Sequence, residues 1–188
     1  FESLDESTLK QMNKGFNMMK GGPAEALARL RQHNICVYGT FIFGYDHDSP
    51  ESFRTTMEFA KSNGLFIGAF NHVTPFPGTP LYKRMEKEGR LLFDAWWLDD
   101  EYRYNMIPFT PANMTPKDLE DMCLSARKEF YSWPSIFRRG RKRVNVRNPY
   151  RFVNYLVINA MHRYDVSGRS GLPLGDESWQ GELLKAES

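Results

Sequence analysis

Two continuous apolar runs, separated by one helical segment, constrain the fold of this chain most strongly. The first run covers residues 35–43 and the second covers residues 65–70, and nearly every side chain in them is apolar or favours β-structure. Such runs are typical of strands that are buried on both faces of a parallel sheet. Between them, Ser49 and Pro50 indicate the start of a helix and Gly64 indicates its end. The order strand–helix–strand predicts a βαβ unit, and therefore an α/β fold with a parallel sheet.

Further helices are expected on both sides of this unit. Ser3 and Glu6 have the spacing of a capping box, and Thr115 followed by Pro116 is a strong helix start. The sequence around Pro134 is expected to interrupt the helix that follows Thr115. The expected helices cover about residues 4–14, 24–33, 81–88, 116–131 and 149–164, with a loose tail at 167–188.

Three regions follow from this order. Residues 1–89 alternate helices and strands, residues 90–147 carry an aromatic segment and a helix, and residues 148–188 form a terminal helix and the tail. Only two complete strands are predicted, and a parallel pair with open edges is too small to be stable alone. We therefore expect several strands to precede Phe1, so that this chain would be a piece of a longer polypeptide.

Composition excludes several classes of protein. Hydrophobic residues make up 41% and charged residues 26% of the 188 residues, which is ordinary for a globular domain. The net charge of +2 does not indicate a nucleic-acid partner, so that partner is not expected. Cys36 and Cys123 form neither a disulfide framework nor a metal-ligand pattern. No signal peptide or membrane span is recognisable, and the expected localisation is cytoplasmic, with membrane association left open.

Candidate functional residues follow the predicted strands, because parallel α/β folds collect function at the carboxyl ends of their strands. Three segments fall there: Glu2–Ser3, residues 44–48 and residues 74–79. They are expected to converge on one rim. The carboxylate of Glu2 can accept hydrogen bonds from an amine or hydroxyls, and the proline-rich loop at 74–79 holds its backbone groups rigidly. Ring faces or edges for a flat ligand are expected from Phe41, Phe43 and Phe76, and close backbone approach from Gly39 and Gly44.

Each of these residues also has a purely structural interpretation. Glu2 can support a helix N-terminus through the helix dipole, and Gly39 can mark a bulge or tight packing. Phe41 and Phe43 share one strand face, which is typical of core residues. The 74–79 loop can be only a stiff turn. His47 stands between two aspartates, which favours an exposed turn over a metal site.

A basic cluster precedes the last predicted helix, whose apolar residues recur at helical spacing. Such a pattern fits either an anionic membrane surface or nucleic acid, and it also fits a solvated connector beside a helix that docks on the domain. The cluster consists of Arg138, Arg139, Arg141, Lys142, Arg143 and Arg147.

The motifs together resemble a known family. The opening Phe1-Glu2-Ser3-Leu4-Asp5 is similar to the segment that follows the fourth strand of the partial barrel in radical SAM enzymes. Residues 39–44 with 48–53 are similar to the fifth strand and the turn after it, and residues 74–82 to the loop after the sixth. The remainder, including residues 96–109 and 130–135, resembles the C-terminal region of the group that carries a cobalamin-binding domain, of which hopanoid-modifying methylases are one branch.

This resemblance implies a fold and a chemistry. The fold would be the second half of a partial (β/α)6 TIM-like barrel followed by a mainly helical extension. The cofactors would be S-adenosylmethionine (SAM) and a 4Fe–4S cluster, with cobalamin in an upstream domain as a further expectation. Reductive cleavage of SAM yields a 5′-deoxyadenosyl radical, and cobalamin-type members use it to methylate an unactivated carbon. The cofactor-binding residues would be Glu2, Ser3, Gly39, Phe41, Phe43, Gly44, Val73, Thr74 and Pro75, with the aromatic segment 96–104 over the substrate.

One departure from the family matters. The cluster needs a C-x-x-x-C-x-x-C triplet, which this chain lacks. The resemblance thus predicts that the cluster ligands lie upstream, that the missing N-terminal part of the polypeptide is the first partner, and that this piece alone is inactive. The substrate is expected to be a small molecule or a lipid, with peripheral membrane contact at the basic–apolar segment. The alternative function is a non-enzymatic basic module that binds nucleic acid or an anionic membrane.

Overall fold

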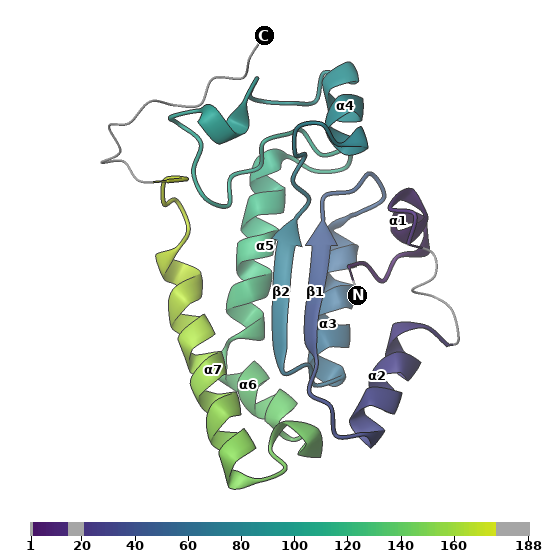
Figure 1. Cartoon of the computed structure of the whole chain (residues 1–188), viewed down its shortest axis with the longest axis vertical. Helices are drawn as coiled ribbons and strands as arrows, with labels where there is room; N and C mark the ends of the chain where they lie inside the picture. The colour runs from purple at the N-terminus through teal and green to yellow at the C-terminus, as the bar shows by residue number, and fades with distance from the viewer. Residues whose placement is uncertain (1, 15–20, 176–188) are drawn as a thin grey trace.

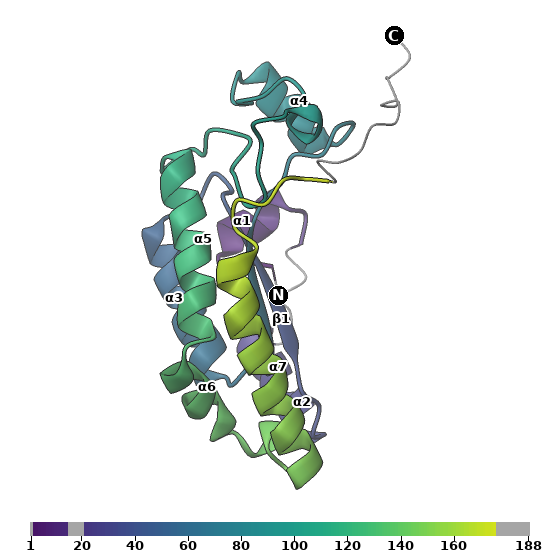
Figure 2. The ribbon, with the colours of Figure 1, turned by 90° about the vertical axis from the view of Figure 1, so that its left-hand side faces the viewer.

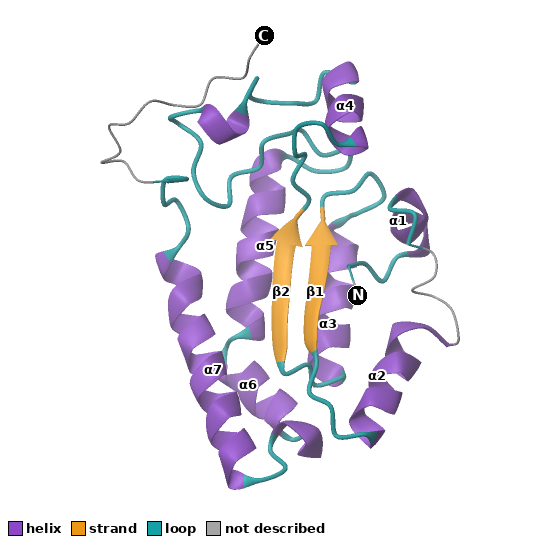
Figure 3. Ribbon diagram, viewed as in Figure 1, coloured by secondary structure: helices purple, strands orange, loops and turns teal. Residues whose placement is uncertain are grey.

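The computed structural model describes residues 2–14 and 21–175 and has a mixed α/β fold. Phe1 and most of the expected tail, from residue 176 onward, lie outside the described residues. Figures 1 and 3 show helices arranged around one short sheet. In chain order, the elements are α1 (Glu6–Gln11), α2 (Gly22–Gln32), β1 (Tyr38–Phe43), α3 (Pro50–Ser62), β2 (Ile67–His72), α4 (Pro80–Lys87), η2 (Trp96–Leu98), α5 (Pro116–Phe130), α6 (Trp133–Gly140), η3 (Arg143–Asn145) and α7 (Pro149–Gly168).

The sheet pairs β1 and β2 in parallel, and α3 connects them. The helix begins as predicted, because Ser49 and Ser52 form a reciprocal capping box and Pro50 takes the first position. Gly64 ends the segment with a φ of 64°, a conformation that glycine adopts without strain. The α/β class and the βαβ unit are therefore confirmed.

One face of the sheet is covered by helices, and the other is open. Beneath α3 and α5, Phe41 stacks on Phe70 with ring centroids 5.4 Å apart. On the other face, Tyr38 is 60% exposed and Asn71 is also exposed. Figure 2 shows α3 and α5 on the same side of the strands. The open face is unusual, because parallel sheets are normally covered on both sides.

Glu2 extends the sheet on the edge of β1 that lies away from β2. Its N–H donates to the carbonyl oxygen of Thr40, and its carbonyl oxygen accepts from the N–H of Ile42, both at 2.8 Å. The bridge between Glu2 and Phe41 is parallel. Three parallel backbone segments thus lie side by side in chain order, as expected if a strand ends at Glu2. Three segments do not by themselves establish a partial barrel.

The helices after residue 115 complete the core. Thr115 caps α5 and Pro116 is its first residue, as predicted, and Asp118 completes a capping box. The ring of Phe130, the last residue of α5, lies 5.1 Å from the Phe70 ring. Residues before and after position 89 share this core, since Met85 and Phe109 belong to one buried cluster. The three predicted domain boundaries stay a prediction.

The sequence interpretation missed α6. The helix after Thr115 ends at Phe130, close to its predicted end at residue 131, but Pro134 then stands in the first turn of a new helix, where its missing N–H costs nothing. Ser132 caps this helix, because its hydroxyl accepts a hydrogen bond from the N–H of Ser135. The last helix, α7, runs to Gly168 and so exceeds its predicted end near residue 164.

Candidate functional site

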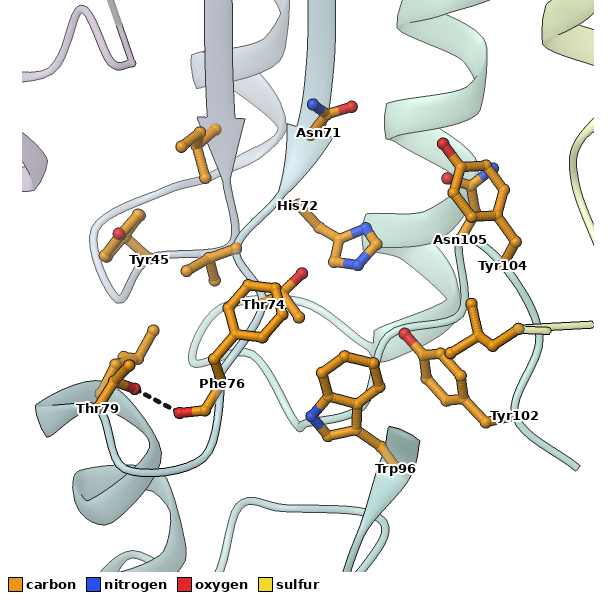
Figure 4. A pocket seen from close by; sticks show the side chains of 14 residues that line it. Tyr45, Asn71, His72, Thr74, Phe76, Thr79, Trp96, Tyr102, Tyr104 and Asn105 are labelled. Atoms are coloured by element: carbon orange, nitrogen blue, oxygen red, sulfur yellow. Dashed lines mark hydrogen bonds between the residues drawn. The ribbon is translucent and has the colours of Figure 1, made fainter. Parts of the chain in front are cut away.

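A pocket of about 570 Å³ opens at the carboxyl ends of β1 and β2. One part of its wall comes from the strand ends and the loop after β2, and the other part from the extension after residue 89 (Figure 4). The residues that line it are Ile42, Tyr45, Asn71, His72, Val73, Thr74, Phe76, Thr79, Leu81, Trp96, Tyr102, Tyr104, Asn105 and Leu174.

The loop after β2 enters this pocket. The N–H of Val73 donates to the carbonyl oxygen of Phe43 at 2.7 Å, so the pairing of the strands continues into the loop. Thr74 lines the pocket, whereas Pro75 is buried. The carbonyl oxygen of Pro75 accepts a hydrogen bond from the indole Nε1–H of Trp96 at 3.0 Å. The sequence had suggested that Pro75 presents its carbonyl group to a ligand. In the structure, this group accepts a hydrogen bond within the protein instead.

The aromatic segment after residue 89 forms the second wall. Trp96 is 8% exposed, and its ring centroid lies 5.1 Å from that of Tyr102 and 5.8 Å from that of Phe76. Phe76 itself is 57% exposed. The aromatic stretch thus lies against the strand ends, and its position over a substrate stays a prediction.

The loop after β1 is held by two aspartates. Asp48 is 1% exposed and accepts hydrogen bonds from the N–H groups of Gly44 and Tyr45 at 2.9 and 3.0 Å. Burial raises the pKa of Asp48 to about 6, although these hydrogen bonds and one from Thr8 oppose the shift. His47 is exposed, so the interpretation of this segment as a turn is confirmed.

Asp46 ties the same loop to other elements. It accepts from Arg90 at 2.8 Å and also pairs with Arg84 and Gln11. Burial alone would raise the pKa of this carboxyl, but the hydrogen bonds from Arg90, Arg84 and Gln11 together hold it below its usual value. The loop is therefore fixed on both sides of His47.

Glu2 lies at the same end of the sheet. One carboxylate oxygen pairs with Lys14, and the other, Oε2, is buried without a hydrogen-bond partner among the described residues. The helix cap of α1 is Asp5, which accepts from the N–H of Thr8 at 2.7 Å. Ser3 is 7% exposed, and its hydroxyl accepts from the N–H of Asp5. Asp5 thus performs the capping, and Glu2 pairs with Lys14 instead of bonding to the helix N-terminus.

Four of the predicted cofactor-binding residues require correction. Phe41 and Phe43 are 0% and 3% exposed, and Phe43 stacks on Phe53 of α3 at 3.8 Å. Both rings are core residues on the covered face, where no adenine can reach them. A Cβ at Gly39 would lie 2.5 Å from Leu65, and one at Gly44 would lie 2.7 Å from Leu119. These glycines thus serve internal packing rather than close approach of a ligand.

His72 and Asn105 are pocket residues that the sequence interpretation missed. Nδ1 of His72 is buried without a partner in the described part of the chain. Burial, and then the positive charge of Arg127, lower the pKa of His72 to about 4, so its imidazole is neutral at pH 7. Asn105 adopts a φ of 76° and accepts from Arg127 at 3.0 Å. The position of His72 at the end of a predicted strand was the available signal.

The two cysteines do not form a metal site. Cys36 donates a hydrogen bond to the carbonyl oxygen of Val144, and burial raises the pKa of Cys123 to about 12. Across residues 2–14 and 21–175, no group of three or more His, Cys, Asp or Glu side chains is placed to hold a metal ion.

Two members of the basic cluster are not free surface charges. Arg139 is fully buried, donates to the carbonyl oxygens of Leu65 and Phe130 at 2.9 Å, and lies over the Phe130 ring at 3.8 Å. Arg138 pairs with Glu58 of α3. The other four basic residues are exposed, so both interpretations of the cluster stay predictions. Of the helices in the described part of the chain, none has the length and apolar character needed to cross a bilayer.

Comparisons with known proteins identify the class of molecule. Residues 79–162 match a family model described as a domain of unknown function, DUF4070. The chain is 37% identical to the bacteriochlorophyllide d C-12(1)-methyltransferase of Chlorobaculum tepidum over 74% of this chain and 29% of that protein. The corresponding C-8(2)-methyltransferase of the same organism is 24% identical over 87% of this chain and 34% of that protein. The hopanoid C-2 methylase of Rhodopseudomonas palustris is 33% identical over 50% of this chain and 18% of that protein.

These relatives carry the names of methyltransferases and a methylase, so the comparisons support an enzyme family for this chain. The resemblance to the C-terminal part of radical SAM enzymes of the cobalamin-binding-domain group is confirmed. At family level this group uses SAM and a 4Fe–4S cluster. The chain spans about a third or less of the length of each of these three relatives.

Proposed function

We propose that this chain supplies the last strands of a partial barrel, with its helical extension, to a radical SAM methyltransferase. Two features support a barrel: the parallel order of Glu2, β1 and β2, and the open face of the sheet, which would be its interior. The pocket then lies at the rim where parallel α/β enzymes bind their ligands.

The described residues fit a part of SAM, and the unpartnered carboxylate oxygen of Glu2 carries this assignment. Buried polar atoms are normally hydrogen-bonded, so Oε2 of Glu2 calls for a donor such as an amine or a ribose hydroxyl. Thr74 lies in the loop after β2, on the opposite side of β1 from Glu2, and lines the pocket. Its backbone N–H makes no hydrogen bond with another described residue. It can donate to an adenine edge.

The described residues do not fit a 4Fe–4S cluster, because they offer no suitable group of ligands. We assign the cluster ligands, and any cobalamin site, to polypeptide outside this chain. In the whole enzyme, SAM beside such a cluster would supply radical chemistry at an unactivated carbon, and cobalamin, where present, would supply the methyl transfer. Without those parts, this chain is proposed to be inactive.

In this proposal, the residues of this chain bind SAM and orient it. Glu2 holds the polar end of SAM, and Thr74 holds its adenine. Asp48 and Asp46 fix the loop beside Glu2, and the hydrogen bond from Trp96 to Pro75 fixes the loop beside Thr74. The aromatic wall keeps water from the space between them. The enzyme is proposed to be cytoplasmic and to act on a small molecule or a lipid, with peripheral membrane contact in the second case.

Formation of 5′-deoxyadenosine from SAM tests this function in the full-length, cluster-loaded protein with a strong reductant. We expect product from the wild type and a loss of about tenfold or more in Glu2→Gln, which keeps the shape of the side chain but loses its charge. Glu6→Gln is the matched control, since Glu6 lies on α1 and is exposed. No 5′-deoxyadenosine from the wild type, or equal amounts from all three proteins, would overturn the proposal.

A further inference from the structure

The part of the pocket wall that the extension builds is mainly aromatic. Trp96, Tyr102 and Tyr104 border it, and Phe76 closes it from the loop after β2 (Figure 4). Trp96 and Tyr102 are buried, so the accessible ring surface comes mainly from Tyr104 and Phe76, which are 40% and 57% exposed. Such rigid ring surface prefers flat or polycyclic partners. The shape of this wall therefore favours a planar or polycyclic ligand.

The residues that line the pocket include no Asp, Glu, Lys or Arg. His72 is the only one of them whose side chain normally titrates near neutrality, and its imidazole is neutral at pH 7. The nearby cation of Arg127 is engaged elsewhere, because it donates to the carbonyl oxygen of Phe70 and to Asn105. A charged ligand group would thus lose its hydration without meeting a charged side chain among the residues that line the pocket. The ligand portion held here is expected to be uncharged.

His72 is the polar group of this region. Its ring projects from the end of β2 into the space between Asn105 and Trp96 (Figure 4). Nδ1 of the imidazole makes no hydrogen bond with another described residue, although the side chain lies in the pocket wall. A buried polar group without a partner is costly unless a ligand or water satisfies it.

We propose that the extension's half of the pocket binds the substrate, that the substrate portion held there is an uncharged planar or polycyclic carbon skeleton, and that His72 donates a hydrogen bond to a carbonyl or hydroxyl group on it. This inference rests on the proposed function only where it calls the bound ligand the substrate. The pocket assignment itself concerns binding alone and can be tested without catalysis.

The test uses 6-propionyl-2-(dimethylamino)naphthalene, a flat, neutral fluorophore whose emission moves to longer wavelength when its carbonyl accepts a hydrogen bond. We expect the full-length protein to bind it and Tyr104→Ala to weaken binding by about tenfold, because a ring wall is lost. His72→Phe keeps a ring at that position, so it should shift emission to shorter wavelength and weaken binding by about threefold to tenfold. Unchanged emission in His72→Phe would overturn the role of His72.

Tyr164→Ala is the matched control for adhesion to exposed aromatic surface, because Tyr164 on α7 is 88% exposed. It should leave binding unchanged. Weaker binding in Tyr164→Ala than in Tyr104→Ala would place the probe on α7 and overturn the pocket assignment. Competition tests the charge of the ligand. The neutral N-phenyl-1-naphthylamine should displace the probe, whereas its sulfonate, 8-anilino-1-naphthalenesulfonate, should need at least about a tenfold higher concentration for the same displacement. Equal displacement would overturn the uncharged class.

Saturating SAM separates this inference from the proposed function. The probe should stay bound when SAM is added, since the two ligands take different halves of the pocket. Displacement of the probe by SAM would overturn the substrate assignment and make the whole pocket the cofactor site. If SAM does not bind while the probe still responds to Tyr104→Ala and His72→Phe, the proposed function fails and the pocket assignment stands.

Discussion

The indole N–H of Trp96 donates a hydrogen bond to the carbonyl oxygen of Pro75, 3.0 Å away, and so joins the C-terminal extension to the loop after β2. This bond is buried, and it closes one wall of the pocket. The extension is therefore part of the site and not only a neighbour of it.

Trp96→Phe removes this hydrogen bond and leaves the Pro75 carbonyl buried. We expect the free energy of unfolding to fall by about 1–3 kcal/mol, measured by urea denaturation. Trp97→Phe is the control, because Trp97 is 36% exposed and makes ring contacts but no such bond. Equal losses in the two variants would contradict the role assigned to the bond.

Arg139→Met tests the buried guanidinium. Arg139 is 0% exposed, and its donors satisfy the carbonyl groups of Leu65, Phe66 and Phe130. The variant strands the carbonyl groups of Leu65 and Phe130, whereas that of Phe66 keeps a hydrogen bond from Asn159, so we expect a loss of about 2–4 kcal/mol in the free energy of unfolding. Arg141→Met changes an exposed side chain and should cost less than about 0.5 kcal/mol. A small loss in Arg139→Met would mean that these carbonyls find other donors.

Gly44→Ala tests the tight turn after β1. Gly44 has a φ of 101°, and an added Cβ would lie 2.7 Å from Leu119. Backbone strain and overpacking together should cost about 2–4 kcal/mol. Gly78 has a φ of 80°, but a Cβ added there would meet no other atom within 4 Å, so Gly78→Ala should cost only about 1 kcal/mol. Similar losses at the two positions would show that packing at Gly44 is loose.

Asp48 and Asp46 should change stability with pH in opposite directions. The folded-state pKa of Asp48 is raised to about 6 from 3.8, so the native state binds a proton more readily and wild-type stability falls as pH rises from about 4 to 6. Asp48→Asn should remove this fall. The resulting gain over the wild type at pH 8 has an upper limit of about 3 kcal/mol.

The pKa of Asp46 is held below its usual value, so its contribution is present above pH 4 and is lost as pH falls further. Asp46→Asn should therefore be destabilising at pH 7, by an amount that shrinks as pH falls below 4. Urea unfolding of both variants across pH 3–8 measures these differences. The same sign for both variants at pH 7 would contradict the assigned environments.

Local signals predicted the sheet and most helices, because apolar runs and capping residues such as Ser49 and Thr115 act over a few positions. A continuous apolar run does not indicate which residues face the helices, and Phe41 was therefore misassigned to a ligand site. The pocket depends on contacts between distant segments, such as Asn105 with Arg127, that no local pattern reveals. Arg139 was misread for the same reason: its sequence neighbours are basic, but its partners lie elsewhere in the fold.

Direct titration of SAM into the full-length protein tests the central claim that Glu2 binds the cofactor. By isothermal titration calorimetry, we predict that Glu2→Gln binds SAM about tenfold or more weakly than the wild type, because its buried, unpartnered oxygen no longer carries charge. Glu6→Gln should bind as the wild type does. Equal SAM affinity in Glu2→Gln and the wild type would contradict the account.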